Sequence, residues 1–257
     1  RDAEGYTFMG WSTKPMQSVS PQYEAEEKIT VNGNVDLYAV VFNRTTETDL
    51  TEDQLPQVDI YKYKQVIFVG DSRTEFMENV LTGMGESVTK NVKFVCSAGK
   101  GLDWFTTTGW AQLYSIVQHD SNSILSKKTA VIFNFGVNDL SKSADYAEYY
   151  NWIAPQLKSK GCELYFMSVN PVNRLMLPNA GRADRSEAAV RSFNQYMKAN
   201  LSSAYTYIDM YSYLKSTGYS FASDHYGTGT VDDGLHYTTR TYKRIFAKCM
   251  DSLRVPA

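Results

Sequence analysis

Short apolar segments alternate with amphipathic ones from about residue 62 to the end of the chain. The apolar segments have the length of buried strands and occupy residues 65–70, 92–96, 129–135, 163–169 and 205–208. The segments between them place apolar residues at helical spacing, at residues 74–84, 104–119, 144–158, 186–201 and 239–253. This alternation predicts βαβ units with right-handed crossovers, and therefore an α/β fold with a five-stranded parallel sheet between two layers of helices.

The first 43 residues show a different pattern. Short strand-like segments at residues 5–11, 29–31 and 35–42 are separated by turns, and Asn32-Gly33-Asn34 indicates a hairpin between the last two. The stretch from Asn43 to Gln57 is polar and typical of a linker. We therefore expect a small β-rich module at residues 1–43, a linker at 44–61 and an α/β domain at 62–257.

The composition is that of a globular protein. The chain has 257 residues, 43% hydrophobic and 21% charged, and its net charge of −2 argues against nucleic acid as a partner. No segment approaches the roughly 20 consecutive apolar residues of a membrane span. The sequence starts at Arg1, within a pattern and without a signal peptide, so we expect it to be part of a longer protein. Cys96, Cys162 and Cys249 lie in apolar segments and are expected to be buried free thiols.

Four short segments with candidate chemistry lie at predicted strand ends or in the loops that follow, where open α/β sheets bind their ligands. They are Gly70-Asp71-Ser72-Arg73, Ala98-Gly99-Lys100-Gly101, Gly136-Val137-Asn138-Asp139 and Asp233-Gly234-Leu235-His236. Ser72 follows a buried strand and a tight glycine turn, and the spacing of Asp233 and His236 lets an aspartate orient the imidazole that takes the serine's proton. The sequence thus contains the residue types of a serine triad in one of its known chain orders.

The spacing supports other chemistry less well. Asp224, His225, Asp232, Asp233 and His236 gather in one region, but no set of three ligands at metal spacing is evident, so we expect no metal site. The segment at residues 99–101 lacks the frame of a phosphate loop, and no cofactor is expected. The remaining histidines, His119 and His225, have no partners of the triad type, and we interpret them as surface or loop residues.

In order and spacing, the four segments resemble the four blocks of the SGNH hydrolase family, also called GDSL esterases, across nearly all of residues 62–257. The resemblance implies a flavodoxin-like, three-layer α/β/α fold and a serine esterase without a cofactor. It implies that Ser72 is the nucleophile, that His236 is the general base and that Asp233 orients this base. It also implies an oxyanion hole formed by the backbone N–H groups of Ser72 and Gly101 and by the amide of Asn138.

Two positions in these blocks are open to interpretation. Both Gly99 and Gly101 are placed to donate a backbone N–H to the oxyanion, and we favour Gly101. Arg73 departs from the family pattern, because many relatives carry leucine there, and we expect it at the rim of the pocket. Asp71, Arg73 and Gly99 are therefore our candidates for contact with the substrate.

The candidate residues also have structural interpretations. Ser72, with Glu75 three residues further on, is a common start signal for a helix. Asn138 and Asp139 could cap the next helix, and a single histidine such as His236 is more often structural. The joint presence of all four segments favours an active site over these alternatives.

The N-terminal pattern has a resemblance of its own. Gly5-Tyr-Thr-Phe-Met-Gly-Trp-Ser-Thr13, the turn at Val31-x-Gly33 and Leu37-Tyr-Ala-Val40 resemble the last two thirds of a Listeria–Bacteroides repeat, which occurs in bacterial surface and secreted proteins. The resemblance implies a β-grasp-like module, a secreted or cell-surface location in a bacterium, and association with the cell wall or surface. The alternative is a β-extension packed on the catalytic domain.

From these patterns we expect a serine esterase that acts on short acyl esters, most of all acetyl groups on a carbohydrate. The same site could serve a lipase, a thioesterase or an acyltransferase. A different class is a surface adhesin or binding module with an inactive hydrolase domain, although the complete set of catalytic residue types argues against it. The long loop at residues 170–185 is expected to border or cover the acyl pocket.

Overall fold

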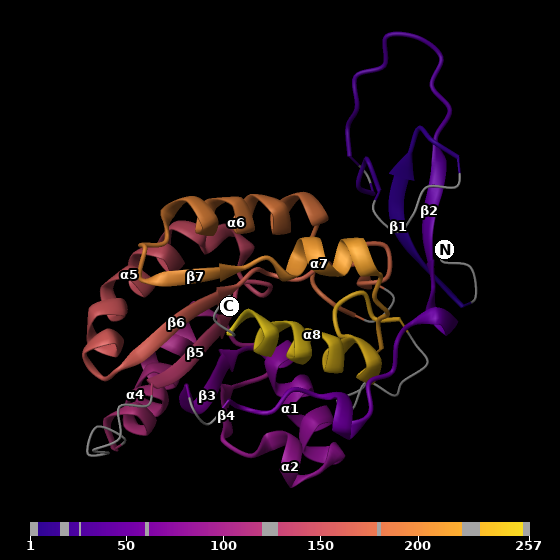
Figure 1. The fold of residues 1–257 in the computed structure, drawn as a ribbon. Helices are drawn as coiled ribbons and strands as arrows, with labels where there is room; N and C mark the ends of the chain where they lie inside the picture. Colours follow the sequence, from indigo (N-terminus) through magenta and orange to yellow (C-terminus); the bar gives the residue numbers. More distant parts are fainter. Residues whose placement is uncertain are drawn as a thin grey trace.

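The computed structural model describes residues 5–15, 21–25, 27–59, 62–119, 128–178, 181–222 and 232–253. A five-stranded parallel sheet with the order β4-β3-β5-β6-β7 forms its centre (Figure 1). The strands are β3 (Tyr63–Gly70), β4 (Val92–Cys96), β5 (Lys128–Asn134), β6 (Cys162–Met167) and β7 (Tyr205–Ile208). The predicted α/β fold with five parallel strands is confirmed.

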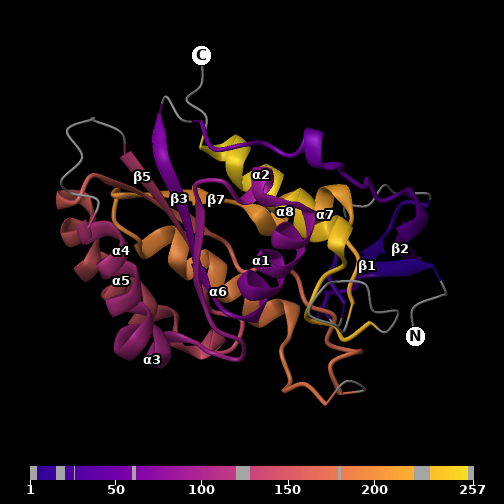
Figure 2. The same ribbon diagram turned by 90° about the horizontal axis from the view of Figure 1, so that it is seen from below.

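Helices cover both faces of this sheet, because successive side chains of a buried strand point to opposite sides. On one face, Val66 and Phe68 of β3 pack in a core with α1 (Ser72–Met84), α7 (Met210–Thr217) and α8 (Thr239–Ser252). On the other, Ile67 and Val69 pack with α4 (Trp110–His119), α5 (Ser143–Ser159) and α6 (Glu187–Asn200). Figure 2 shows α1 and α8 on one side of the strands and α4 and α5 on the other. The shorter helical segments are η1 (Arg44–Thr46), η2 (Glu52–Gln54), α2 (Glu86–Thr89), α3 (Leu102–Trp104), the π-helical η3 (Phe105–Gly109) and η5 (Leu140–Lys142).

The carboxyl ends of β3 and β5 lie side by side where the chain reverses its direction across the sheet. From β3 the chain passes outward to β4 and then returns to β5 on the other side of β3. Loops that leave neighbouring strands in opposite directions open a crevice between them, where α/β proteins bind ligands. Gly70 pairs with Asn134 at these two strand ends, so the segments that carry Ser72 and Asn138 start from the same edge.

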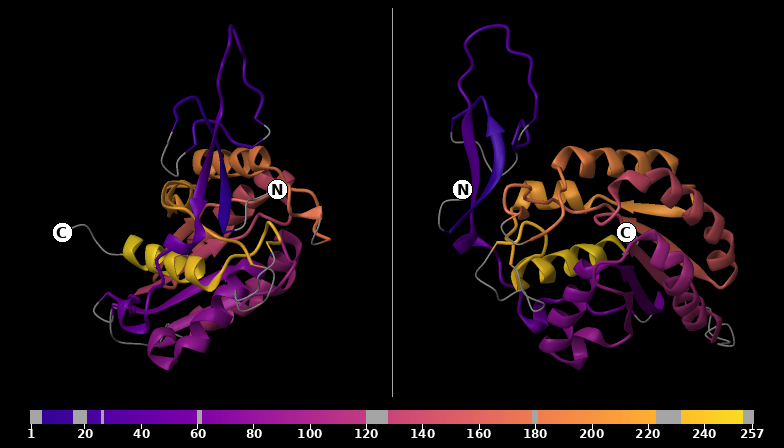
Figure 3. Two further views of the ribbon diagram at one scale, coloured as in Figure 1. Left: turned by 90° about the vertical axis from the view of Figure 1, so that its right-hand side faces the viewer. Right: turned by 180° about the vertical axis from the view of Figure 1, so that it is seen from behind.

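The N-terminal module is simpler than the expected β-grasp-like unit. It consists of two antiparallel strands, β1 (Tyr6–Ser12) and β2 (Tyr38–Asn43), with an isolated bridge between Trp11 and Tyr23. The predicted strand at residues 29–31 and the hairpin turn after it are not formed. Residues 27–37 project away from the α/β domain, and among the described residues no strand lies beside them to pair with residues 29–31 (Figure 3).

The β1–β2 hairpin is packed firmly on the α/β domain. Met9, Val40 and Phe42 are buried in the same core as α7 and α8. Lys215 of α7 reaches across, where its ammonium donates a hydrogen bond to the carbonyl of Met9 at 2.6 Å and pairs with Glu24 at 2.7 Å. The structure therefore agrees with the alternative of a β-extension that packs on the domain.

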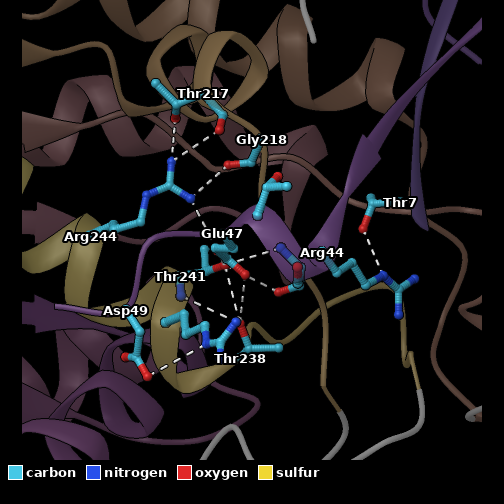
Figure 4. A network of polar contacts seen from close by, with 12 residues as sticks. Thr7, Arg44, Glu47, Asp49, Thr217, Gly218, Thr238, Thr241 and Arg244 are labelled. Atoms are coloured by element: carbon cyan, nitrogen blue, oxygen red, sulfur yellow. Dashed lines mark hydrogen bonds and ion pairs between the residues drawn. The ribbon is translucent and has the colours of Figure 1, made fainter. Parts of the chain in front are cut away.

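The segment expected to be a linker is also packed. Leu55 and Val58 are buried in the core next to α8, and the partly buried Leu50 packs against the same core. Glu47 is buried as well, where it pairs with Arg244 of α8 at 3.1 Å and accepts a hydrogen bond from the hydroxyl of Thr241 (Figure 4). The described residues of this segment, 44–59, are a part of the folded domain and not a flexible connection.

Three further findings concern composition. Cys96, Cys162 and Cys249 are all free, and Cys96 is half-buried where full burial was expected. None of the helices in the described ranges combines the length and the hydropathy that a membrane span requires. Within the same ranges, no group of three or more His, Cys, Asp or Glu side chains is placed to hold a metal ion.

Candidate active site

The turn from β3 to α1 presents Ser72 at the carboxyl edge of the sheet. Gly70 is required there, because a Cβ at this position would lie 2.0 Å from the Thr74 hydroxyl oxygen and 2.8 Å from the carbonyl oxygen of Asn134. Asp71 caps α1, since its carboxylate accepts a hydrogen bond from the N–H of Arg73 at 3.0 Å. The capping role considered for Ser72 thus belongs to Asp71, and the Ser72 hydroxyl takes no part in it.

The Asp233–His236 turn is built by its own carboxylate. Asp233 Oδ1 accepts hydrogen bonds from the backbone N–H groups of Leu235 at 2.9 Å and His236 at 2.7 Å. Gly234 lies between them with a φ of +70°, and a Cβ there would come within 2.3 Å of the carbonyl oxygen of Asn173. The local sequence therefore fixes the backbone that carries the histidine.

A continuous chain of hydrogen bonds joins the three predicted triad residues. His236 Nδ1 lies 2.6 Å from Asp233 Oδ2, and His236 Nε2 lies 2.9 Å from Ser72 Oγ. The side chains are buried, and the ring of Phe76 stacks on the imidazole with centroids 4.2 Å apart. With the proton on Nδ1 donated to Asp233, Nε2 is free to accept the proton of Ser72.

The electrostatic environment favours the neutral form of this histidine. Burial lowers the pKa of His236 below its ordinary value, the bond to Asp233 offsets part of this effect, and the charges of Arg73 and Arg182 lower it further. Burial opposes ionisation of Asp233, but the hydrogen bond and charge of His236 outweigh it and hold the pKa of this carboxyl below its usual value. At neutral pH the pair is therefore a carboxylate beside a neutral base.

Asn138 faces the same cavity as Ser72, and its side-chain amide is fixed on both sides. Its Nδ2 donates to the carbonyl of Lys100 at 2.8 Å, and its Oδ1 accepts from Nη2 of Arg185 at 2.9 Å. Arg185 is itself held by the carbonyl of Val137 at 2.6 Å. The second N–H of the amide is left for a ligand in the cavity.

The structure places Gly99, and not Gly101, beside the serine. Gly99 lines the cavity with Ser72 and Asn138, at a φ of +69°. Gly101 is turned toward Asp139, whose carboxylate would lie 2.3 Å from a Cβ on that glycine and accepts the N–H of Leu102 at 2.9 Å. The structure therefore favours Gly99 over Gly101 beside the cavity, and the identity of the glycine donor stays a prediction.

Asp71 and Arg73 lie behind the site and do not reach the cavity. Each residue is 2% exposed. The Arg73 guanidinium donates to the carbonyls of Leu235 at 2.9 Å, Asn170 at 2.8 Å and Pro171 at 2.7 Å, so it ties α1 to two loops of the site. Burial raises the pKa of Asp71 to about 6, although the N–H and charge of Arg73 oppose this rise. The expected substrate contact of these two residues is corrected to a structural role.

The cavity next to Ser72 has a volume of about 310 Å³. Part of its wall comes from the predicted loop at residues 170–185, through Gly181, Arg182, Ala183 and Arg185. Arg182 also donates to Asp233 Oδ2 at 3.1 Å, the same oxygen that the histidine contacts. The length of this loop makes it recognisable in the sequence, whereas its two arginines have no motif of their own.

Two other histidines were singled out in the sequence. His119 ends α4, on the opposite face of the sheet from α1. His225 and its neighbour Asp224 lie outside the described residues.

The fold and this geometry are typical of α/β/α hydrolases that act through a serine. The family model of GDSL-like lipases and acylhydrolases matches residues 66–249, which is well over half of the chain. The chain belongs to this family of ester-hydrolysing enzymes, and the resemblance inferred from the four sequence segments is confirmed.

Solved structures with the same fold agree. A proposed SGNH hydrolase from Slackia heliotrinireducens has a TM-score of 0.52 at 13% identity, covering 75% of this chain and 100% of its own. A proposed acylhydrolase from Bacteroides fragilis has a TM-score of 0.50 at 13% identity, covering 81% of this chain and 92% of its own. The acetyl xylan esterase AlAXEase has a TM-score of 0.50 at 12% identity, covering 74% of this chain and 100% of its own. At these identities the likeness establishes the fold alone. A search of curated protein sequences finds no match.

Proposed function

We propose that this chain is a serine esterase that hydrolyses short acyl esters, acetyl esters above all. The observation that carries the proposal is the chain of hydrogen bonds from Ser72 through His236 to Asp233, with contacts of 2.9 and 2.6 Å. This series of hydrogen bonds ends on a serine hydroxyl beside a cavity of about 310 Å³. That volume is at the lower end of the roughly 300–1,000 Å³ of small-molecule sites, which favours a small acyl group.

The proposed reaction begins with attack of Ser72 Oγ on the ester carbonyl carbon, while the serine proton passes to His236 Nε2. The carbonyl oxygen becomes an oxyanion that accepts hydrogen bonds from the N–H groups of Ser72 and Gly99 and from Asn138 Nδ2. Collapse of the intermediate breaks the ester C–O bond, and His236 returns its proton to the leaving alcohol. Water then attacks the acyl-enzyme with the same base, which releases the acid and restores the serine hydroxyl.

A carbohydrate as the alcohol part of the substrate is suggested by a second hollow in the described part of the protein. Its volume is about 510 Å³, and Leu102, Tyr149 and Trp152 line it together with the carboxylates of Asp145 and Glu148. Trp152 is 58% exposed. Flat aromatic faces and oxygen acceptors match sugar rings, which are apolar on one face and carry hydroxyl donors at the edge. A glycan substrate also fits the secreted or surface location that we propose from the resemblance of the hairpin.

The test is hydrolysis of 4-nitrophenyl acetate, butyrate and octanoate by the wild-type chain and by Ser72→Ala. We expect the highest rate on acetate and no enzymatic rate in the variant. Ser159→Ala is the matched control, because Ser159 lies at the end of α5 and its hydroxyl donates to the carbonyl of Gln156 at 2.7 Å. Rates that rise with chain length would replace the short-acyl proposal with a lipase or thioesterase.

The other candidate activities are separated by two additions to this assay. An added sugar acceptor that receives the acetyl group faster than water would identify an acyltransferase. A fluorophosphonate probe that fails to label Ser72 in folded protein would support the inactive surface module. Labelling of the wild type but not of Ser72→Ala supports the esterase, even where no tested ester is the natural one.

A further inference from the structure

The cavity beside Ser72 carries positive charge. Of the residues that line it in the described part of the chain, only Arg182 and Arg185 are charged. Arg182 has 37% of its side chain exposed, and Arg185 comes from the same loop, two residues before the start of α6. No carboxylate is among the described lining residues. A ligand in the cavity therefore meets two cations and no anion.

Nearby carboxylates lie outside the described lining of the cavity, although Asp233 pairs with Arg182 at 3.1 Å and Glu75 accepts the N–H of Ala98, a lining residue, at 2.7 Å. Asp71 and Asp233 are buried behind the wall, and Asp233 is shared between Arg182 and His236. Asp139 binds the hydroxyl of Tyr146 at 2.8 Å and the N–H of Leu102 at 2.9 Å. A substrate in the cavity therefore contacts the guanidinium groups and not these carboxylates.

Arg185 has no ion-pair partner among the described residues. Its three hydrogen bonds go to the uncharged oxygens of Val137 at 2.6 Å, Ala183 at 2.9 Å and Asn138 at 2.9 Å. Burial lowers the pKa of this guanidinium, and the like charges of Arg73 and Arg182 lower it further, in part offset by Asp71 and Asp233. Arginine is retained in such surroundings where its charge and fixed donor geometry have a use.

Arg182 still has donors available after its contact with Asp233. One Nη2–H is used at 3.1 Å, and the Nε of this side chain is buried without a hydrogen-bond partner. Buried donors without partners are rare in folded proteins and call for an explanation. The exposed part of the side chain still carries Nη donors, and a ligand oxyanion in the cavity would find acceptor partners there, because a guanidinium binds a carboxylate through two parallel N–H donors.

We propose that the substrate carries an anionic group, a carboxylate or a chemically similar oxyanion, close to the ester that is cleaved, and that Arg182 and Arg185 bind it. The proposal rests on the esterase function proposed above and specifies its substrate class. The contacts place the anion within reach of the reacting groups, because Arg182 touches Asp233 and Arg185 touches Asn138. The group belongs either to the acyl part, as in a hemiester of a diacid, or to the alcohol part, as in an acidic sugar.

The competing explanation gives the arginines a structural role only. In that case Arg182 holds Asp233, and Arg185 holds the amide of Asn138, whatever the substrate. A purely structural role predicts that substitution lowers the rate on charged and neutral esters equally. Selective recognition predicts that substitution lowers the ratio of kcat/KM for charged over neutral esters. The ratio is therefore the quantity to measure.

Two pairs of esters distinguish the two locations of the charge. The 4-nitrophenyl hemiester of hexanedioic acid is compared with 4-nitrophenyl hexanoate, which tests an anion on the acyl side. The ester 4-acetoxybenzoate is compared with its methyl ester, which tests an anion on the alcohol side. Each is measured for the wild type, Arg182→Gln, Arg182→Lys and Arg185→Gln. Arg174→Gln is the matched control, since Arg174 lies on the same loop, pairs with Asp184 at 2.6 Å and does not line the cavity.

We expect the wild type to prefer the charged member of one pair by about 10- to 100-fold, as a charge-assisted hydrogen bond provides, chiefly through KM. Arg182→Gln and Arg185→Gln should lower that ratio by about 10-fold, Arg182→Lys should retain part of it, and Arg174→Gln should leave it unchanged. The preference should also weaken as salt is added. Equal kcat/KM within both pairs, or equal losses on charged and neutral esters, would overturn the proposal.

Failure of the esterase itself gives a different result. If no ester is cleaved, binding of hexanedioate and of 1,6-hexanediol to Ser72→Ala is measured by ligand-observed NMR at millimolar concentration. Binding of the diacid alone, lost when Arg182→Gln is added, supports the anion site independently of activity. No binding of the diacid, or equal binding of the diol, rejects it.

Discussion

Two regions of this molecule contain buried pairs of ionisable side chains with similar distances between the partners, yet only one region resembles an active site. At the site, His236 and Asp233 lie 2.6 Å apart. At the hairpin interface, which we define as Glu24, Glu47, Lys215 and Arg244, the pairs Glu24–Lys215 and Glu47–Arg244 lie 2.7 and 3.1 Å apart, and Figure 4 shows the second of these pairs. The carboxylate of Glu47 is as deeply buried as that of Asp233, at 1% and 0% exposure of the side chain.

The difference lies in how the contacts end. At the hairpin interface each charge meets an opposite charge, a hydroxyl or a backbone carbonyl, and the hollow next to Glu24 and Lys215 has a volume of only about 20 Å³, room for a single water. At the candidate active site the series of hydrogen bonds ends on the Ser72 hydroxyl, beside a cavity of about 310 Å³. Burial of charge alone therefore does not indicate catalysis. A chain of hydrogen bonds that ends on a hydroxyl beside an open cavity does indicate it.

The comparison predicts that the two regions fail in different ways. Substitution of His236 by Gln should lower kcat/KM by about 10⁴-fold or more, because the base is lost, while the melting temperature changes little. The measurement combines ester hydrolysis with thermal unfolding. A variant that keeps more than a hundredth of the activity would remove His236 from the proposed mechanism.

Glu47→Ala should show the opposite behaviour. It leaves Arg244 buried without its partner, which costs about 3–5 kcal/mol of unfolding free energy, and the folded fraction should keep its kcat. Asp49→Asn is the control, since Asp49 lies on the same segment and pairs with Lys243, but half of its side chain is exposed. Because Asp49 is half-exposed and Lys243 keeps its hydrogen bond to the carbonyl of Leu50 at 2.7 Å, we expect a loss of about 1 kcal/mol or less in denaturant unfolding. Equal losses from both substitutions would contradict the proposed importance of the buried pair.

Asn138→Ala tests the donors of the site without removing the triad. We expect kcat to fall by about 100- to 1,000-fold, the typical effect of losing one oxyanion donor. Asn138→Asp is the informative companion, because it keeps the size and the acceptor for Arg185 but removes the N–H donor. An Asp variant as active as the wild type would mean that Asn138 only positions its neighbours.

The smallest predicted effect is on the pH profile. Because burial lowers the pKa of His236, kcat/KM should lose activity toward acid pH with a midpoint below 6.5, where the base becomes protonated. Arg182→Gln removes a positive charge and should move this midpoint upward by less than about one unit. Asp71→Asn is the control, since burial raises the pKa of Asp71 to about 6, and the substitution should leave the midpoint in place. A midpoint that moves with Asp71 would assign the titration to that residue.

The sequence predicted the fold from local patterns, and the resemblance of the four segments predicted the three residues that the structure joins by hydrogen bonds. Strand periodicity and the glycine turn before Ser72 specify where the serine lies, and the Asp233-x-x-His236 turn closes on its own backbone. The contact between Arg182 and Asp233 joins residues 51 positions apart, and the pair Glu47–Arg244 joins residues 197 positions apart. No periodicity encodes such contacts. For the same reason, the choice between Gly99 and Gly101 depended on Asp139 from a different loop.

The contacts of Lys215 with Met9 and Glu24 have a mechanical consequence. They fix the hairpin to the α/β domain, so that it is not a flexible connection. The orientation of a domain fused ahead of the hairpin would therefore be passed on to α7. In such a fusion the mouth of the serine cavity would keep a set angle to its support and could not swing freely through the surroundings. The enzyme would then reach only the esters that lie within a fixed range of directions from its support, and the hairpin would determine this range.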